Sequence, residues 1–277
     1  MGRFGRTWQL FKESFVVLAG DSEILVFPVC SGISLLLLGA SFFIPLYRDG
    51  TLQAVLRHKG TWDDYAVLFA WYYLNFFVGI FFNSALMGCA NIRLSGKQPT
   101  VGAGFRIALN RLGRIAAWAL VAASVGMFLS SLRDRNNKLL SIVAAGLSLA
   151  WSLVTYLIVP VLLFEDRGVL NSLHRSEELF RSHWGEQVAG SFGFGVLTTL
   201  LSIPAVVLVV ACWRLDPMTG IILGAVYLLI LATVASAVRG VFTVALYRYA
   251  TAGSAPPGFS ADVIDGALGG RGCASQK

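Results

Sequence analysis

The sequence predicts an all-α, polytopic membrane protein. Its six transmembrane helices are arranged as three units, each with an interfacial amphipathic helix and a transmembrane hairpin. Hydrophobic residues make up 56% of the chain and charged residues only 13%, whereas about a quarter of the residues in a soluble domain are charged. A helix needs roughly 20 consecutive apolar residues to cross a bilayer. Six stretches satisfy this length, at about 24–46, 65–90, 114–132, 139–164, 187–213 and 218–246.

The first amphipathic segment covers residues 4–19 and precedes the first pair of spans. Its apolar side chains recur at the 3.6-residue spacing of a helix. They are Phe4, Trp8, Phe11, Phe15 and Leu18. Acidic residues up to position 23 argue against a cleavable signal peptide, so the first span is predicted to remain as an anchor.

The second amphipathic segment follows Thr100, which is predicted to cap a helix over 101–118. Its apolar stripe contains Phe105, Leu109, Leu112 and Ala116, and its polar side contains Arg106, Asn110 and Arg114. We expect this helix to lie in the plane of the lipid headgroups.

The third amphipathic segment, 169–184, belongs to a charged stretch between two uncharged spans. That stretch, Glu165 to Gln187, contains five acidic residues, three arginines and two histidines. The apolar stripe of the segment consists of Val169, Leu173, Phe180 and Trp184. An interfacial helix is the favoured interpretation, and a catalytic loop is the alternative.

The three segments and the pairs of spans predict one membrane domain over 1–250, followed by a flexible cytoplasmic tail over 251–277. Each unit crosses the bilayer twice, so all three amphipathic helices fall on one side. The loops on that side carry fourteen of the 22 Lys and Arg residues. Because positive charge marks cytoplasmic loops, we expect a multi-pass protein of the plasma membrane with both termini in the cytoplasm. Since the basic residues follow the topology, no nucleic-acid partner is predicted.

Three segments of the chain resemble a family of prokaryotic integral membrane proteins, the domain of unknown function family 6159. The resemblance is carried by "VGAGFRIALNRLGRIAAWAL", "LIVPVLLFEDRGVLNSLHRSEELFRSHWGEQ" and "ALYRYATAGSAPPGFSADVIDGAL". It covers nearly the whole chain and implies a helical membrane protein. It implies no reaction, cofactor or catalytic residue.

Polar side chains within the predicted spans are candidates for function, because they are costly in a bilayer. Arg239 lies in the sixth span, where it could bind a lipid phosphate or another anion. Alternatively it snorkels to the headgroups or pairs with Glu165, Asp166 or Glu186. The intramembrane polar candidates are Asn75, Asn83 and Glu177. For the two asparagines, hydrogen bonds between helices are favoured and a polar permeation path is the alternative. For Glu177, a local ion pair with Arg181 is favoured and a proton-linked or substrate-binding carboxylate is the alternative.

The sequence favours a non-enzymatic membrane protein whose basic helices engage anionic lipid or a protein partner in the membrane. The candidates for lipid or anion binding are Arg239, Arg175, Arg181, Arg106 and Arg114. A transporter or channel for a small solute or a lipid is the alternative. A lipid-processing enzyme is disfavoured, because no nucleophile or acid/base constellation is recognisable. No metal or cofactor is predicted, since the four cysteines and three histidines lack metal-ligand spacing.

Overall fold

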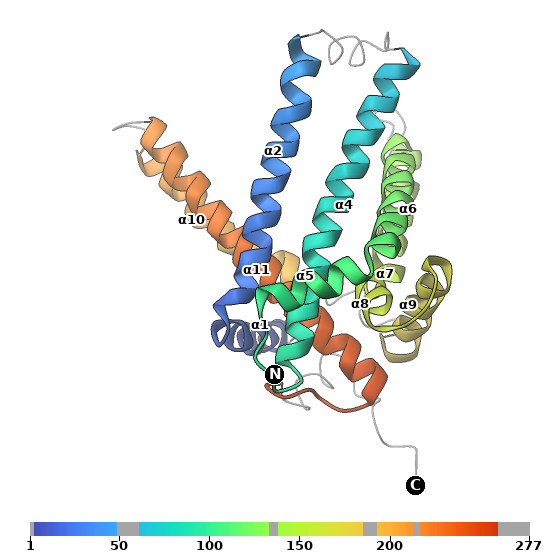
Figure 1. The fold of residues 1–277 in the computed structure, drawn as a ribbon. Coiled ribbons are helices and arrows are strands. Elements are labelled where there is room, and N and C mark those ends of the chain that lie inside the picture. Colours follow the sequence, from blue (N-terminus) through green and yellow to red (C-terminus); the bar gives the residue numbers. More distant parts are fainter. Residues whose placement is uncertain (1–2, 49–60, 133–137, 185–192, 213–216, 260–277) are drawn as a thin grey trace. The chain divides into compact units, whose positions relative to one another are not determined.

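The computed structural model describes residues 3–48, 61–132, 138–184, 193–212 and 217–259, and every regular element in these ranges is a helix (Figure 1). This confirms the all-α prediction. The elements are α1 (Arg3–Ala19), the short 3-10 helix η1 (Ser22–Leu25), α2 (Val26–Arg48), α4 (Trp62–Arg93), α5 (Val101–Asn110), α6 (Leu112–Ser131), α7 (Lys138–Val154), α8 (Ile158–Phe164), α9 (Val169–Trp184), α10 (Gly193–Cys212) and α11 (Pro217–Ala252).

Five segments in the described ranges are long and apolar enough to cross a membrane. They are Glu23–Arg48, Trp62–Arg93, Leu112–Ser131, Leu139–Phe164 and Met218–Ala252. The predicted span 187–213 falls partly outside the described residues, and α10 is the part of it that the structure describes. The protein is therefore a helical membrane protein by the length and composition of its helices.

The chain divides into two compact units, each built from segments that are distant in sequence. The first unit comprises Met1–Pro28, Leu86–Gly104 and Glu178–Lys277. The second comprises Val29–Ala85 and Phe105–Glu177.

In the first unit, α10 and α11 pack closely because two glycines of α11 face α10. Gly220 and Gly224 are buried, and a Cβ atom on either would lie within 3 Å of an α10 side-chain atom. Their spacing of four residues is that of the small-residue motif that lets membrane helices approach each other. The GxxxG pattern, which by itself is a weak signal in the sequence, marks a close helix contact here.

A polar network in the first unit ties the turn after α1 to the end of α4 and the start of α5. Arg93 Nε lies 2.9 Å from Asp21 Oδ2. The backbone N–H of Val101, the first residue of α5, donates to Glu23 Oε2 at 2.9 Å. Thr100 Oγ1 accepts from the N–H of Ala103 at 3.2 Å, which confirms the predicted N-cap. The first N–H groups of α5 are thus satisfied by side chains.

The end of α11 is tied to the end of α4 by one arginine. Arg248 donates to Ser95 Oγ at 2.7 Å and to the carbonyl oxygen of Asn91 at 3.2 Å. Beyond α11, Pro256 and Phe259 are buried. The part of the predicted tail that the structure describes, 253–259, therefore carries side chains that pack on the protein. The rest of the tail lies outside the described residues.

The core of the second unit lies where α6 and α8 meet. Trp118, Ala122, Ile158 and Leu162 form a buried cluster. Trp118 also stacks on Trp151 of α7, with ring centroids 5.8 Å apart. Such aromatic pairs contribute about 0.5–1.5 kcal/mol beyond the area that they bury.

The apolar face of α9 packs on this core. Val169 and Leu173, two of the four residues of the predicted stripe, lie against the buried cluster. Ser172 and Ser176, on the same face, are fully buried. Packing of this face on the protein core is therefore an alternative to the prediction that the same apolar side chains of α9 lie in lipid.

Two predicted helices are interrupted in the second unit. The helix predicted over 101–118 breaks at Arg111, whose N–H bonds to the carbonyl of Ala108, three residues back. The span predicted over 139–164 breaks between Val154 and Ile158, just before Pro160. Proline has no N–H and its ring clashes with the carbonyl four residues earlier, which explains this break. The freed carbonyl of Val154 accepts a hydrogen bond from Ser176 Oγ at 2.6 Å.

Candidate anion-binding site

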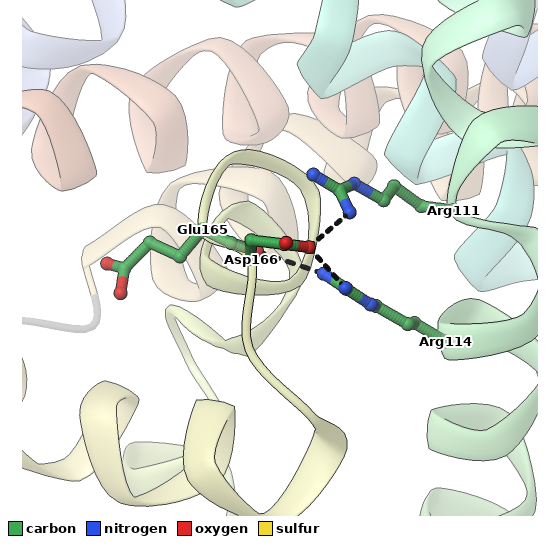
Figure 2. Close-up of polar contacts among 4 residues, drawn as sticks. All are labelled: Arg111, Arg114, Glu165 and Asp166. Carbon is green, nitrogen blue, oxygen red and sulfur yellow. Dashed lines mark hydrogen bonds and ion pairs between the residues drawn. The ribbon is translucent and has the colours of Figure 1, made fainter.

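Two arginines of the second unit converge on one carboxylate. Arg111, at the break between α5 and α6, donates from Nη1 to Asp166 Oδ1 at 2.9 Å. Arg114, in the first turn of α6, donates from Nη2 to the same oxygen. Arg114 Nη1 also donates to the carbonyl oxygen of Glu165 at 3.1 Å. Figure 2 shows both guanidinium groups reaching Asp166 from the same side, while the Glu165 side chain points away from them.

Two further arginines pair with the carboxylate of Glu165. Arg167 Nε lies 2.8 Å from Glu165 Oε2, and Arg175 Nε lies 3.6 Å from Glu165 Oε1. The loop between α8 and α9 therefore contributes two carboxylates and Arg167, and three further arginines pair with these carboxylates. We call these six residues the arginine cluster: Arg111, Arg114, Glu165, Asp166, Arg167 and Arg175. Its formal charge is positive when both acids are ionised.

The two arginines keep Asp166 ionised. Hydrogen bonds from Arg114 and Arg111, together with their charges, hold the pKa of the Asp166 carboxyl below its ordinary value of 3.8. A lowered pKa means that this ion pair contributes to stability above the ordinary value and is lost only as the pH falls through the lowered value. At neutral pH the Asp166 carboxylate is therefore ionised.

The residues of the cluster lie at two interruptions of the helices. Helix α8 ends at Phe164, Glu165 follows with an extended backbone (φ −100°, ψ 145°), and Gly168 precedes α9. Arg111 separates α5 from α6. The membrane segments Leu112–Ser131 and Leu139–Phe164 have their start and their end at this cluster.

Residues 63–258 of the chain match a family described as a family of unknown function, DUF6159. The chain belongs to the DUF6159 family. This confirms the resemblance seen in the sequence, and the matched range contains the whole arginine cluster. No curated protein and no solved structure matches this DUF6159 chain.

The arginine cluster of the DUF6159 protein contains two of the five candidates for anion binding, Arg114 and Arg175. Of the others, Arg106 is exposed on α5 and Arg181 is exposed on α9. Sequence inspection did not select Arg111 or Arg167. Their position is the signal that could have found them. Arg111 precedes the first span of one predicted hairpin and Arg167 follows its second span, next to two acidic residues, so the predicted topology puts these charges on the same side of the membrane.

The fifth candidate, Arg239, lies in the first unit, on a helix that is longer than a bilayer is thick. α11 has 36 residues and is about 54 Å long, against roughly 30 Å for the hydrocarbon core. Its large apolar side chains are exposed in the first half, at Met218, Ile221, Ile222, Leu223, Val226, Leu228, Leu229 and Ile230. They are buried in the second half, at Val238, Val241, Val244, Leu246, Tyr247 and Tyr249.

Arg239 is exposed at the junction between these two halves. It lies about 33 Å along α11 from Pro217, which is roughly one bilayer thickness. That position supports the snorkelling alternative, in which the guanidinium reaches the headgroups. Of the suggested carboxylate partners, Asp166 is bonded to Arg111 and Arg114, and Glu186 lies outside the described residues.

The intramembrane polar candidates lie on two helices. Asn75 donates from Nδ2 to the carbonyl oxygen of Trp71 at 2.7 Å, so its amide bonds to its own helix α4. Asn83 is half-buried two turns later, and Glu177 is half-buried on α9. A hydrogen bond to the preceding turn lets a polar side chain exist in a membrane helix without a partner helix. This is a third account of Asn75, besides a link between helices and a permeation path.

Proposed function

We propose that this protein is a non-enzymatic protein of the plasma membrane whose basic amphipathic helices engage anionic lipid on the cytoplasmic side. The observation that carries the proposal is the exposed apolar face of α1. This helix buries Ser14, Val17 and Leu18, yet Trp8 and Phe15 remain 48% and 45% exposed. Trp8 and Phe15 are seven residues apart and therefore share one face of the helix.

An exposed aromatic face on a basic helix has a simple use at a bilayer. Tryptophan and phenylalanine enter the boundary between headgroups and acyl chains, while lysine reaches the phosphates. Lys12 is exposed between Trp8 and Phe15. Each Lys or Arg near an anionic surface contributes about 1 kcal/mol to membrane binding. The burial of aromatic side chains adds a term that salt does not screen.

The proposal includes six spans, with α10 as the fifth, and places α1, α5 and α9 together on the cytoplasmic side. The distribution of basic residues supports this arrangement. Lys97 and Thr61 flank the two ends of α4, and both are exposed. In a cysteine-free background, Thr61→Cys should react with an impermeant thiol reagent in intact cells, and Lys97→Cys should react only after lysis. The reverse pattern would invert the orientation.

Lipid contact at α1 is testable with a photoreactive amino acid. We expect p-benzoylphenylalanine at Phe15 to crosslink to phospholipid, in liposomes with equal amounts of phosphatidylglycerol and phosphatidylcholine. The matched control is the same residue at Val17, which is 9% exposed and should crosslink to protein. Mass spectrometry of the adducts should show an excess of phosphatidylglycerol that Lys12→Gln reduces. Crosslinking of position 15 to protein alone would contradict the proposal.

A transporter for a small solute or a lipid is the second candidate, and the break between α7 and α8 favours it. Interrupted membrane helices form substrate sites in many transporters. Ser176 bonds to the carbonyl of Val154 at this break. One turn earlier on α9, the hydroxyl of Ser172 is buried and has no hydrogen-bond partner among the described residues. Solute flux in proteoliposomes that Ser172→Ala abolishes would favour transport over lipid engagement.

A further inference from the structure

We propose that Arg111 and Arg114 form a binding site for a phosphate monoester group and that Asp166 closes this site as an internal competitor. The shared chemistry is a terminal phosphate, either on a lipid headgroup or in solution. The lipid source rests on the proposed function, because it requires the cluster to face anionic lipid.

The first argument is the geometry of the donors. Both guanidinium groups direct an N–H at one oxygen, Asp166 Oδ1. A guanidinium fork fits an anion best when two oxygens accept from it. A carboxylate has two oxygens for two forks, whereas a phosphate monoester offers three terminal oxygens and a charge of about −1.5 to −2. A phosphate would therefore satisfy the two arginines better than Asp166 does.

The second argument is the difference in solvent exposure between Asp166 and the two arginines. The Asp166 side chain is 79% exposed, but those of Arg111 and Arg114 are 28% and 29% exposed. The carboxylate is thus the outermost group, and water can solvate it when it leaves. An ion pair with one exposed partner contributes little net stability, so its exchange for another anion costs little.

The third argument is preorganisation. Arg114 also donates to the carbonyl oxygen of Glu165, which holds its guanidinium in place when Asp166 leaves. Donors that are already oriented lose less entropy when a ligand binds. Arg167 and Arg175, held by Glu165, add positive charge near the site. The cluster as a whole carries four cations and two anions, so a phosphate dianion would balance its formal charge.

The fourth argument is depth. The cluster lies where one membrane segment begins at Leu112 and another ends at Phe164. Lipid phosphates lie at this level of a bilayer. A monoester headgroup, as in phosphatidic acid, could reach the site from the membrane, and a soluble phosphate could reach it from water.

The experiment measures thermal unfolding of the purified full-length protein in a neutral detergent. The added probes are dioctanoyl phosphatidic acid, dioctanoyl phosphatidylglycerol and inorganic phosphate. We expect phosphatidic acid to raise the Tm with saturation, and phosphatidylglycerol, a diester with one charge, to raise it less. Stabilisation by inorganic phosphate alone would assign the site to a soluble ligand. No stabilisation by phosphatidic acid or by inorganic phosphate would overturn the proposal.

The variants separate a binding site from a structural ion pair. Arg111→Gln should remove most of the stabilisation by phosphatidic acid, and Arg111→Lys, which keeps the charge without the fork, should retain part of it. Asp166→Asn should lower the Tm without ligand and also lower the apparent Kd about tenfold. That factor applies if Asp166 occupies the site about 90% of the time. A merely structural pair would give the lower Tm without tighter binding.

Arg48→Gln is the matched control, because Arg48 is an exposed arginine at the end of α2 that lies outside the cluster. It should bind phosphatidic acid like the wild type. If Arg48→Gln and Arg111→Gln lose equal amounts of the stabilisation by phosphatidic acid, net charge alone explains the effect and the proposal is overturned. Failure of lipid crosslinking at Phe15 with intact phosphate binding would reject the proposed function alone. Lipid crosslinking at Phe15 without stabilisation by phosphatidic acid or phosphate would reject the phosphate site alone.

Discussion

Gly220→Ala should lower the free energy of unfolding by about 1–3 kcal/mol, the range found when a methyl group is forced into a packed interior. A Cβ atom at Gly220 would lie 2.9 Å from Cys212 Cβ and 3.1 Å from the carbonyl oxygen of Val209. Because the second contact is with backbone, a rotamer change cannot relieve it and α10 has to move. Gly224→Ala should cost less, since its backbone contact, with the carbonyl oxygen of Ala205, is longer at 3.3 Å and its nearest contact is the side-chain atom Val209 Cγ2 at 2.7 Å. That side chain is able to rotate.

The matched controls are helical glycines with open space around them. A Cβ atom at Gly39 in α2 or Gly146 in α7 would meet no atom within 4 Å. In these positions alanine should be neutral or stabilise the helix by up to about 1 kcal/mol. Thermal unfolding in detergent, with each variant measured beside the wild type, checks the difference. Equal effects at Gly220 and Gly39 would mean that α10 and α11 do not pack at these glycines.

Arg93→Gln should destabilise the first unit by about 1–3 kcal/mol, more than Asp21→Asn does. The Asp21 side chain is 17% exposed, so loss of Arg93 leaves a largely buried carboxylate without its cation. Glu23, close by in the chain, adds a second negative charge. The Arg93 side chain is 35% exposed and can turn to water when Asp21 is replaced. The cost is therefore asymmetric between the two partners.

A double-mutant cycle tests this asymmetry. The double variant Arg93→Gln with Asp21→Asn should be more stable than Arg93→Gln alone, because it removes the uncompensated charge. Urea unfolding or thermal unfolding of the purified protein gives the four free energies. If the two single effects simply add, the 2.9 Å contact does not couple the residues in the folded protein.

Local signals in the sequence were enough for several features of the fold. Thr100 before a run of helical residues predicted the cap that its hydroxyl makes to Ala103. The apolar runs predicted membrane helices, because only internally hydrogen-bonded segments are stable in hydrocarbon. The family resemblance was confirmed over residues 63–258. The grouping of the basic segments on one side, which follows from the charge bias, stays a prediction.

The arginine cluster could be predicted only in part. Arg114 and Asp166 are 52 residues apart, and nothing in their local sequence says that they meet. Arg111 was missed because it lies at a helix break, and a continuous helical pattern assigns no special role to such a position. The break before Ile158 has a local cause in Pro160. The sequence does not show that the hydroxyl of Ser176 donates a hydrogen bond to the freed carbonyl of Val154.

The sequence by itself determined that this protein is helical, that its longest helices suit a membrane, and which side chains share a face of each amphipathic helix. Only the tertiary structure decided what those faces meet. Val169 and Leu173 of α9 pack on the protein core, whereas Trp8 and Phe15 of α1 stay exposed. The physical reason is that helical periodicity fixes the direction of an apolar side chain, but not its partner. A lipid tail and a leucine-rich helix are equally apolar, so only the assembled fold distinguishes them.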